Sequence, residues 1–338
     1  MNKRRFNKMS NVAVLPQHHK KPKKVETLSI PLNDLESLIT IAKQNVPYRN
    51  INNTMLKAIL PDLEELDAII GMDQLKTTIF YQIIYYLQEL HKKSDDYLHT
   101  VILGPPGTGK TTVAKIIGKL YSNLGILKNK TFTTAKRADL VGEYLGQTSI
   151  KTSKLLKSCI GGVLFIDEVY SLGAGTRDKK DSYSKEAIDA LNIFLSEHKK
   201  DFCCIIAGYE NEVRDCFFSV NPGLERRFPW IHKIDDYSPD DLAKICLKML
   251  KEIKWTTIVE EKELSLLIKD NIDYFKNCGG DIENLITKAK MVHAKRIFAL
   301  DAHHKFILTS HDFKNAIDLI SKNTKKEEKN DIPIGMYS

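Results

Sequence analysis

The 338-residue sequence has no apolar run near the ~20 residues that a membrane-spanning helix needs. Its N-terminus is charged from Lys3 onward and lacks the apolar segment of a secretory signal. The six cysteines include no C-x-x-C pair, and the ten histidines form no H-E-x-x-H motif. These absences argue against a membrane partner, a disulfide framework and a zinc site. We therefore expect an intracellular protein with reduced thiols, in the cytoplasm, with a nuclear location left open.

Acidic residues are also missing from the first 24 positions, which carry eight lysines and arginines. The whole chain has 51 basic and 43 acidic residues, so residues 25–338 balance at 43 of each sign. Residues 1–24 show no hydrophobic periodicity and predict a disordered basic arm. An electrostatic partner such as a nucleic acid would therefore bind this arm and not the folded body.

Strands and helices alternate over residues 63–236, after a partly helical connector at 25–62. Five short apolar segments predict strands: Tyr97–Leu103, Thr131–Thr134, Val163–Ile166, Phe202–Ala207 and Ile231–Ile234. Helical periodicity lies between them, as over Val113–Leu120. This alternation predicts the α/β class, with a parallel sheet flanked by helices on both faces.

The character of the chain changes after Asp236. Ser238-Pro239-Asp240-Asp241 is typical of a helix start, with a hydroxyl cap, a first-turn proline and two acids. Thr309-x-x-Asp312 predicts the start of a further helix. We expect a small all-helical subdomain over residues 237–321 and a polar tail over 322–338.

A glycine-rich loop follows the first strand and carries the first chemical signal. Its pattern is G-x-x-x-x-G-K-T, and glycines let backbone N–H groups turn toward phosphates. The lysine would reach the β- and γ-phosphates of ATP, and the threonine hydroxyl would bind Mg²⁺. The predicted nucleotide-binding residues here are Gly104, Pro105, Pro106, Gly107, Thr108, Gly109, Lys110, Thr111 and Thr112.

Two carboxylates end the apolar strand that begins at Gly162. Parallel sheets deliver such residues to their carboxyl edge, where α/β proteins bind ligands. Asp167 would hold Mg²⁺ together with Thr111, and Glu168 would act as the general base on the attacking water. An Asp-Glu pair is weak evidence alone, and it becomes specific beside a phosphate loop.

The chain resembles an AAA+ ATPase, of the group that includes CbbX, the Rubisco-activase-like protein, and stage V sporulation protein K. The similarity extends from about Leu66 to Ile320. Five ordered motifs carry it: Gly104–Thr111, Asp139–Gly146, Gly161–Glu168, Ile206–Tyr209 and Asn221–Phe228. The resemblance implies a P-loop domain followed by a small helical lid, with ATP bound between them.

The resemblance also implies a homo-oligomeric ring, usually a hexamer, with a catalytic arginine supplied by the neighbouring subunit. That arginine finger falls on Arg227, with Arg226 adjacent, although without the flanking motif a surface arginine pair would be the simpler interpretation. Ile69, Ile70 and Gly71 stand where the family packs the adenine base.

Tyr144-Leu145-Gly146 matches the loop with which the family grips a threaded polymer. A packed aromatic residue is the alternative interpretation. Residues 173–181 form a glycine-containing loop, which is either a second pore loop or a plain solvated loop. Two positions depart from common AAA+ patterns. Many AAA+ proteins have a polar sensor Asn after strand four, where this sequence has Tyr209, as in the subgroup; Gly280 stands where the subgroup has a lid arginine.

The resemblance predicts an ATP-hydrolysing remodeller that acts on a protein client through a central pore. A nucleic-acid remodeller or loader that uses the basic arm is the alternative. A nucleotide-dependent scaffold without turnover is disfavoured, because Glu168 and the Arg226–Arg227 pair are catalytic residue types.

Overall fold

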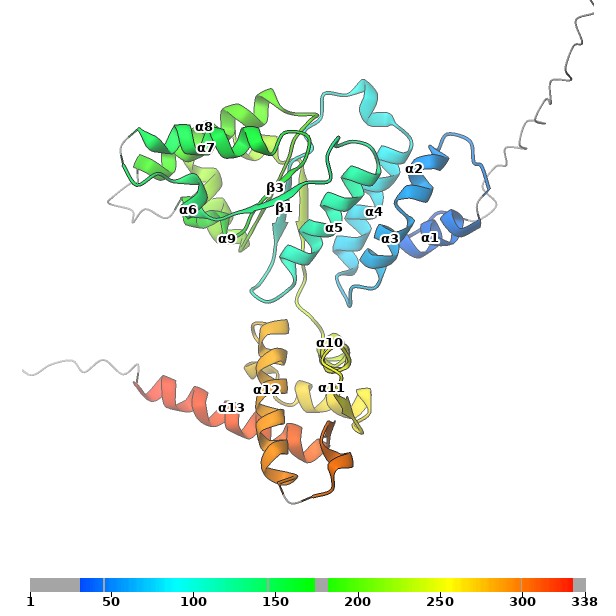
Figure 1. Ribbon diagram of the computed structural model, residues 1–338, viewed down its shortest axis with the longest axis vertical. Helices are drawn as coiled ribbons and strands as arrows, with labels where there is room; N and C mark the ends of the chain where they lie inside the picture. The colour runs from blue at the N-terminus through cyan, green and yellow to red at the C-terminus, as the bar shows by residue number, and fades with distance from the viewer. Residues whose placement is uncertain (1–30, 45, 145, 174–181, 299, 331–338) are drawn as a thin grey trace, which may run out of the picture.

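The computed structural model describes residues 31–44, 46–144, 146–173, 182–298 and 300–330. Figure 1 shows an α/β body and a smaller helical lid, connected by the segment that follows the last strand of the sheet. The basic arm predicted at 1–24 lies outside the described residues. Within those residues, each helix is too short or too polar to cross a lipid bilayer.

A five-stranded sheet forms the centre of the body, and every strand pair in it is parallel. The strands are β1 (Thr100–Leu103), β2 (Phe132–Ala135), β3 (Val163–Ile166), β4 (Cys203–Gly208) and β5 (Trp230–Lys233). Their order across the sheet is β2-β3-β4-β1-β5. The predicted α/β class is confirmed, and each predicted strand overlaps an observed one.

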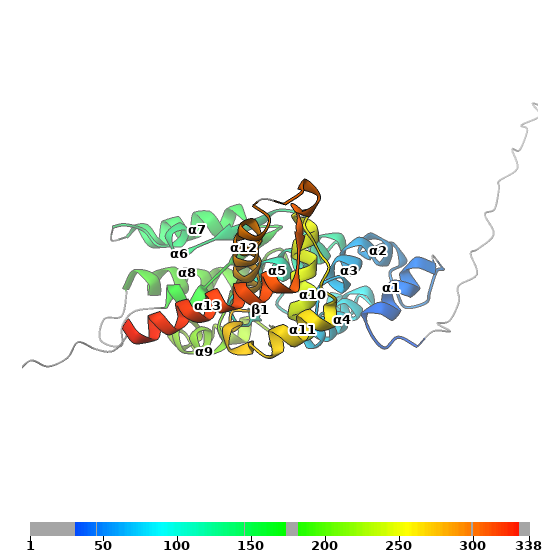
Figure 2. The same ribbon diagram turned by 90° about the horizontal axis from the view of Figure 1, so that it is seen from below.

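Alternate strand residues pack on opposite faces of this sheet, as a period of two requires. Ile102, Phe165 and Ile205 join a core beneath α4 (Asp73–Leu87) and α5 (Lys110–Asn123). Leu164 and Ile206 join a second core, which contains α7 (Gln147–Ser158) and α8 (Ser182–Glu197). Both views place α7 and α8 across the sheet from α4, so helices cover both faces (Figures 1 and 2).

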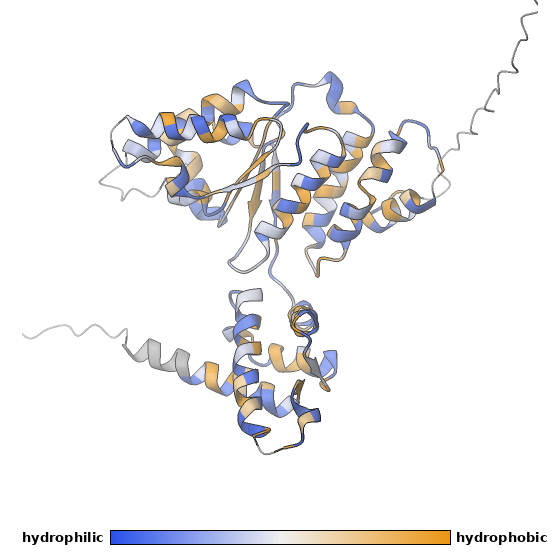
Figure 3. Cartoon of the chain, viewed as in Figure 1, coloured by the Kyte–Doolittle hydropathy of each residue, from blue (hydrophilic) through white to orange (hydrophobic). Residues whose placement is uncertain are grey.

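Three further helices extend the first of these cores. They are α1 (Leu35–Gln44), α2 (Asn53–Ala58) and α3 (Leu60–Asp67), which lie beside α4 and α5 in Figure 1. These helices are amphipathic, with hydrophobic and hydrophilic residues alternating along them in the colouring of Figure 3, and their buried residues include Leu35, Leu56 and Leu66. Leu38, Ile59 and Leu63 are fully buried, so the described part of the expected connector packs against the body.

The lid consists of α10 (Pro239–Glu252), α11 (Glu261–Lys269), α12 (Gly279–Arg296) and α13 (Ser310–Asn330). Ser238 caps α10 as predicted, because its hydroxyl accepts a hydrogen bond from the Asp241 N–H. The predicted Thr309–Asp312 start is also present, since the Thr309 N–H and hydroxyl both donate to the Asp312 carboxylate at 2.9 Å.

The lid differs from the sequence prediction in two respects. First, it is not purely helical, because β6 (Thr256–Thr257) pairs in parallel with β7 (Ile307–Leu308). Two-residue strands leave no alternation pattern in a sequence, which is why the pairing was missed. Second, α13 continues to Asn330, so the boundary expected at residue 321 falls inside a helix.

Candidate nucleotide-binding and catalytic site

The glycine-rich loop connects β1 to α5 at the carboxyl edge of the sheet. Gly107 and Gly109 have positive φ angles of 70° and 84°, which L side chains rarely adopt. Gly109 precedes the first residue of α5, Lys110. The loop therefore presents the N-terminus of a long helix, with its free N–H groups and partial positive charge, to the space above the sheet.

Lys110 lies within this loop and is about half buried. Its ammonium group donates hydrogen bonds to the carbonyls of Gly104 and Pro105, at 2.9 and 2.7 Å. Burial lowers the pKa of Lys110, while the charges of Asp167 and Glu168 act in the opposite direction. The lysine therefore lies in a site that contains two carboxylates and would gain from a further anion.

Asp167 and Glu168 follow β3 and face the loop. The Thr111 hydroxyl donates to Asp167 Oδ2 at 3.3 Å, so the two residues predicted to hold Mg²⁺ are in contact. Glu168 is exposed and has a φ angle of 49°, which is uncommon for a residue with a side chain. The loop and both carboxylates line one cavity of about 220 Å³.

Two aromatic side chains complete the wall of this cavity. Tyr170 follows Glu168 by two residues, and Tyr209 directly follows β4. Their rings stack with centroids 5.4 Å apart and an interplanar angle of 21°. The Lys110 ammonium lies 5.2 Å from the centroid of the Tyr209 ring. The sequence analysis noted Tyr209 and missed Tyr170, although both follow strands whose carboxyl ends meet at this edge.

A more apolar cavity of about 230 Å³ adjoins the phosphate loop on the lid side. Ile69 and Ile70, the residues that stand at the family's adenine position, line it together with Thr112, Tyr237 and Met249. Gly71 does not line either of these two cavities. Its φ of 65° turns the chain so that its Cα faces the Tyr237 ring, where an added methyl would lie 3.3 Å from that ring. Gly71 thus leaves room for Tyr237, which lines the pocket.

The lid side of the chain contacts the loop through one backbone N–H and one side-chain hydroxyl. The Gly279 N–H donates to the Gly107 carbonyl at 3.2 Å, and the Tyr237 hydroxyl donates to the Thr108 carbonyl at 3.1 Å. A methyl at Gly279 would lie only 2.7 Å from the Gly107 carbonyl oxygen. A methyl at Gly280 would have no neighbouring atom within 4 Å. The position expected for a lid arginine is therefore open.

The two candidate finger arginines lie on the turn Glu225–Arg227, away from the cavity of their own chain. Arg226 is exposed. Arg227 is partly buried, and its guanidinium donates to the Ser196 hydroxyl at 2.6 Å and to the Gly223 carbonyl. The structure therefore separates the pair into an outward-facing and an inward-held side chain.

Tyr144, the candidate pore residue, is 67% exposed. This exposure removes the alternative in which the ring packs in the core. Gly146, with a φ of 80°, begins the turn into α7. Leu145 and residues 174–181 of the second candidate loop lie outside the described residues, so the structure does not distinguish the two interpretations of that loop.

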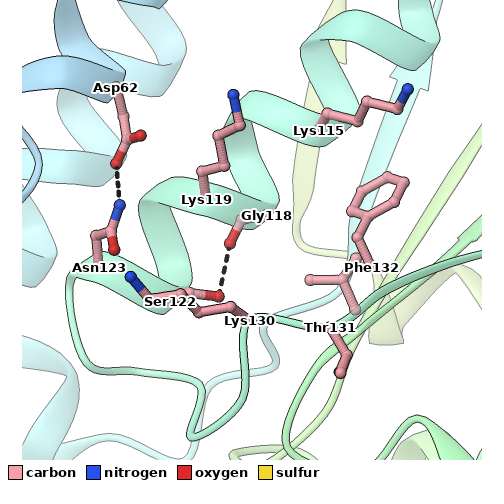
Figure 4. A pocket seen from close by; sticks show the side chains of 10 residues that line it. Asp62, Lys115, Gly118, Lys119, Ser122, Asn123, Lys130, Thr131 and Phe132 are labelled. Atoms are coloured by element: carbon pink, nitrogen blue, oxygen red, sulfur yellow. Dashed lines mark hydrogen bonds between the residues drawn. The ribbon is translucent and has the colours of Figure 1, made fainter.

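A further cavity of about 430 Å³ lies against α5, away from the phosphate loop, and Figure 4 shows its lining. Lys115, Lys119 and Lys130 surround it, and the buried Asp62 accepts a hydrogen bond from Asn123 at 2.6 Å. Although larger, this cavity contains no glycine turn with positive φ and no adjacent pair of carboxylates among its described lining residues. It therefore lacks the groups that nucleotide chemistry needs.

The residues at the carboxyl edge fit a nucleotide with a divalent cation. The helix N-terminus and Lys110 would hold phosphates, and the Thr111–Asp167 pair offers oxygen atoms, which Mg²⁺ prefers. No cluster of three or more metal-binding side chains occurs among the described residues. Mg²⁺ at such sites takes few protein ligands and completes its shell with phosphates and water, so a two-residue site is sufficient.

Comparison with known proteins agrees with this geometry. Residues 100–232 match the model of the family "ATPase family associated with various cellular activities (AAA)". A cfxQ-like protein of Acanthamoeba polyphaga mimivirus is 37% identical over 86% of this chain and 71% of its own length. Stage V sporulation protein K of Bacillus subtilis is 36% identical over 82% of this chain and 89% of its own length.

A chloroplast ribulose bisphosphate carboxylase/oxygenase activase of Cyanidioschyzon merolae is 34% identical, with 73% of this chain and 85% of the activase aligned. Among solved structures, a mutant of the RuvB protein of Thermotoga maritima superposes with a TM-score of 0.52 at 19% identity, covering 75% of this chain and 72% of RuvB. The latter likeness shows the fold alone.

The chain belongs to the AAA+ ATPases. Within them it falls in the group of CfxQ (CbbX) and stage V sporulation protein K, as its resemblance predicted. It is accordingly a nucleotide-binding protein and an ATPase.

Proposed function

We propose that this ATPase forms a ring, usually a hexamer, and uses ATP hydrolysis to pull on a protein client through a central pore. ATP would bind between the α/β body and the lid, with its phosphates on Gly104–Thr111. Mg²⁺ would be held by Thr111 and Asp167, and Glu168 would activate the attacking water.

The observation that carries this proposal is the absence of an arginine from the catalytic cavity. None of the described residues that line it is an arginine, although Lys110 and both carboxylates are present. A guanidinium at the γ-phosphate is a major source of rate in many nucleotide hydrolases. The exposed Arg226, with Arg227 beside it, is suited to enter the cavity of a neighbouring copy. In a closed ring, every copy receives an arginine from its neighbour.

Two features support a protein client and a pore. Tyr144 is exposed on a loop that ends at Gly146, and an aromatic ring contacts an extended chain with little sequence preference. One relative is named an activase of an enzyme, which is a protein target. The charge of residues 1–24 favours the second candidate, a nucleic-acid remodeller or loader.

The experiment combines a trapped variant with two classes of client. Glu168→Gln should bind ATP and hydrolyse it about 10²- to 10⁴-fold more slowly, because the base is lost and the shape is kept. Glu36→Gln, on the exposed side of α1, is the matched control and should be unaffected. Turnover by Glu168→Gln at the normal rate would place catalysis elsewhere.

The client is identified by stimulation and capture. The ATPase rate of the unaltered chain is measured with an unfolded protein, with single-stranded DNA and with RNA. Faster turnover with protein only, and protein retained by ATP-bound Glu168→Gln, is the expected result. Faster turnover with nucleic acid only would favour the second candidate, a nucleic-acid remodeller or loader. If deletion of residues 1–24 then abolished this stimulation, the basic arm would be the nucleic-acid-binding segment.

A further inference from the structure

The stacked pair Tyr170–Tyr209 lies between the two groups on which hydrolysis depends. On one side, the Tyr209 ring faces the Lys110 ammonium at 5.2 Å, within the range of a cation–π interaction. On the other side, Tyr170 stacks on Tyr209 and lines the cavity together with Glu168. Burial raises the pKa of the Tyr170 phenol, and the nearby Glu168 charge raises it further. All four side chains line the same cavity.

The backbone around the pair is built to accommodate it. A methyl at Gly208, the last residue of β4, would lie 2.9 Å from Tyr170 Cδ1 and 2.7 Å from Val213 Cγ2. Only glycine lets the Tyr170 ring lie this close to the strand end. Glu168 has a positive φ, so the chain turns sharply between the carboxylate and the short helix that carries Tyr170. Such backbone outliers cost energy and concentrate at functional sites.

We propose that Tyr170 and Tyr209 are positioning residues for ATP hydrolysis, with the Tyr209 ring holding the Lys110 ammonium and the Tyr170 hydroxyl holding the Glu168 carboxylate. This inference rests on the proposed roles of Lys110 and Glu168. Many AAA+ proteins place a polar side chain at the position of Tyr209. Here a π face fills that position, in a stack that lines the same cavity as the phosphate-binding lysine and the catalytic base.

The pair predicts different defects for its two members. Tyr209→Leu removes the ring from Lys110, so the KM for ATP should rise about 2- to 30-fold, which is the effect of losing 0.5–2 kcal/mol of cation–π attraction. Tyr209→Phe keeps the ring and should restore the KM to within about twofold of normal. Tyr170→Phe keeps the stack and loses the hydroxyl, so kcat should fall about tenfold, with KM nearly unchanged.

These outcomes exclude a merely structural role, because packing defects would not separate KM from kcat between adjacent rings. Melting temperatures are measured alongside, and Tyr81→Phe serves as the control, since Tyr81 is 64% exposed on α4. A kcat within about twofold of normal for Tyr170→Phe overturns the hydroxyl role. A KM that rises equally in Tyr209→Phe and Tyr209→Leu overturns the role of the ring.

Glu168→Gln and Lys110→Ala are assayed in the same series. If both are inactive while the tyrosine variants behave normally, only the present inference fails. If Glu168→Gln turns over normally, the proposed catalytic site itself is wrong, whatever the tyrosines do.

Discussion

The α/β body and the lid position their functional groups by different means. In the body, a buried parallel sheet delivers Lys110, Asp167, Glu168 and Tyr209 from three different strand ends to one edge. The lid brings to the phosphate loop an N–H of Gly279, and no arginine stands at position 280. The charged candidate residues thus lie in the body, whereas the described contacts from the lid side to the loop are an N–H and a tyrosine hydroxyl.

The two parts also differ in how they are held together. Both cores of the body are aliphatic and aromatic, with Leu164, Phe165 and Ile206 at their centre. The lid has a comparable apolar core and a buried carboxylate, Asp312, which accepts hydrogen bonds from Arg296 at 2.8 and 2.9 Å and from Thr309. His293 lies beside it, fully buried. The buried carboxylate of the body, Asp62, accepts a hydrogen bond instead from the neutral Asn123.

The largest expected effect concerns the contact between the body and a neighbouring subunit. Arg226→Ala should bind ATP with normal affinity and lose about 10³- to 10⁵-fold in kcat, because an exposed finger acts only on developing charge. Its melting temperature should not change. Arg227→Ala should lose activity and also about 1.5–3 kcal/mol of stability, since its guanidinium binds Ser196 and Gly223.

Mixing experiments test whether the arginine acts between subunits. Arg226→Ala subunits retain an intact phosphate loop, and Lys110→Ala subunits retain an intact finger, so mixed rings should recover part of the ATPase activity. If mixtures are as inactive as the separate variants, the arginine does not act in trans. Arg226 would then not be the residue that completes the catalytic site of the neighbouring subunit.

The next effect concerns the stability of the lid. Arg296→Met should destabilise it by about 3–5 kcal/mol, because it leaves the Asp312 carboxylate buried without its partner. Hydrogen exchange at the amides of α12 and α13 measures this loss. Lys295→Met, at an exposed position next in the chain, is the matched control. Equal protection in both variants would show that the ion pair does not stabilise the lid.

The same ion pair predicts a pH dependence. Burial raises the pKa of Asp312, but the hydrogen bonds from Arg296 and Thr309 and the charge of Arg296 outweigh it and leave the pKa below its usual value. A depressed folded-state pKa contributes stability that is present above the unfolded pKa of about 3.9 and is lost as the pH falls through the folded value. The stability that this carboxylate contributes to the unaltered chain, measured as the free energy of unfolding, should therefore fall below about pH 4.

A smaller effect tests the contact between body and lid. Gly279→Ala should weaken ATP binding about two- to tenfold, because the methyl would overlap the Gly107 carbonyl and break one backbone hydrogen bond. Gly280→Ala has open space and should leave the affinity within about twofold of normal. Equal Kd values for the two variants would mean that the lid does not act through this contact.

The sequence predicted the body better than the lid, for a physical reason. Thr100–Leu103 and Val163–Ile166 are fully buried segments followed at once by Gly104 and Asp167, so local pattern and burial agree. The β6–β7 pairing joins two-residue strands that lie far apart in the chain, which no local pattern records. Likewise, the spacing of Thr309 and Asp312 predicts a helix start. The hydrogen bond between Asp312 and Arg296 depends instead on how α12 and α13 pack.

The candidate site divides in the same way. The phosphate loop and the Asp167–Glu168 pair are contiguous motifs, and the structure brings them together as the sequence predicted. The stack of Tyr170 on Tyr209 joins two strand ends, and the separation of Arg226 from Arg227 depends on Ser196 in α8. Both features arise from tertiary packing, so they cannot be predicted from the alternation or spacing of residues in the sequence.

The smallest expected effect on the isolated protein is that of Tyr144→Ala. The ring is 67% exposed and contributes nothing to either core, so the melting temperature should stay normal. A fully packed aromatic residue would instead cost about 3–5 kcal/mol on truncation to alanine. Basal ATPase activity should remain within a few-fold of normal, because Tyr144 is not among the described residues that line the catalytic cavity. Stimulation by a client should be lost, since hydrolysis without grip does no work on the polymer. Retained stimulation would remove Tyr144 from the pore, and the body would then contain catalytic groups but no identified grip.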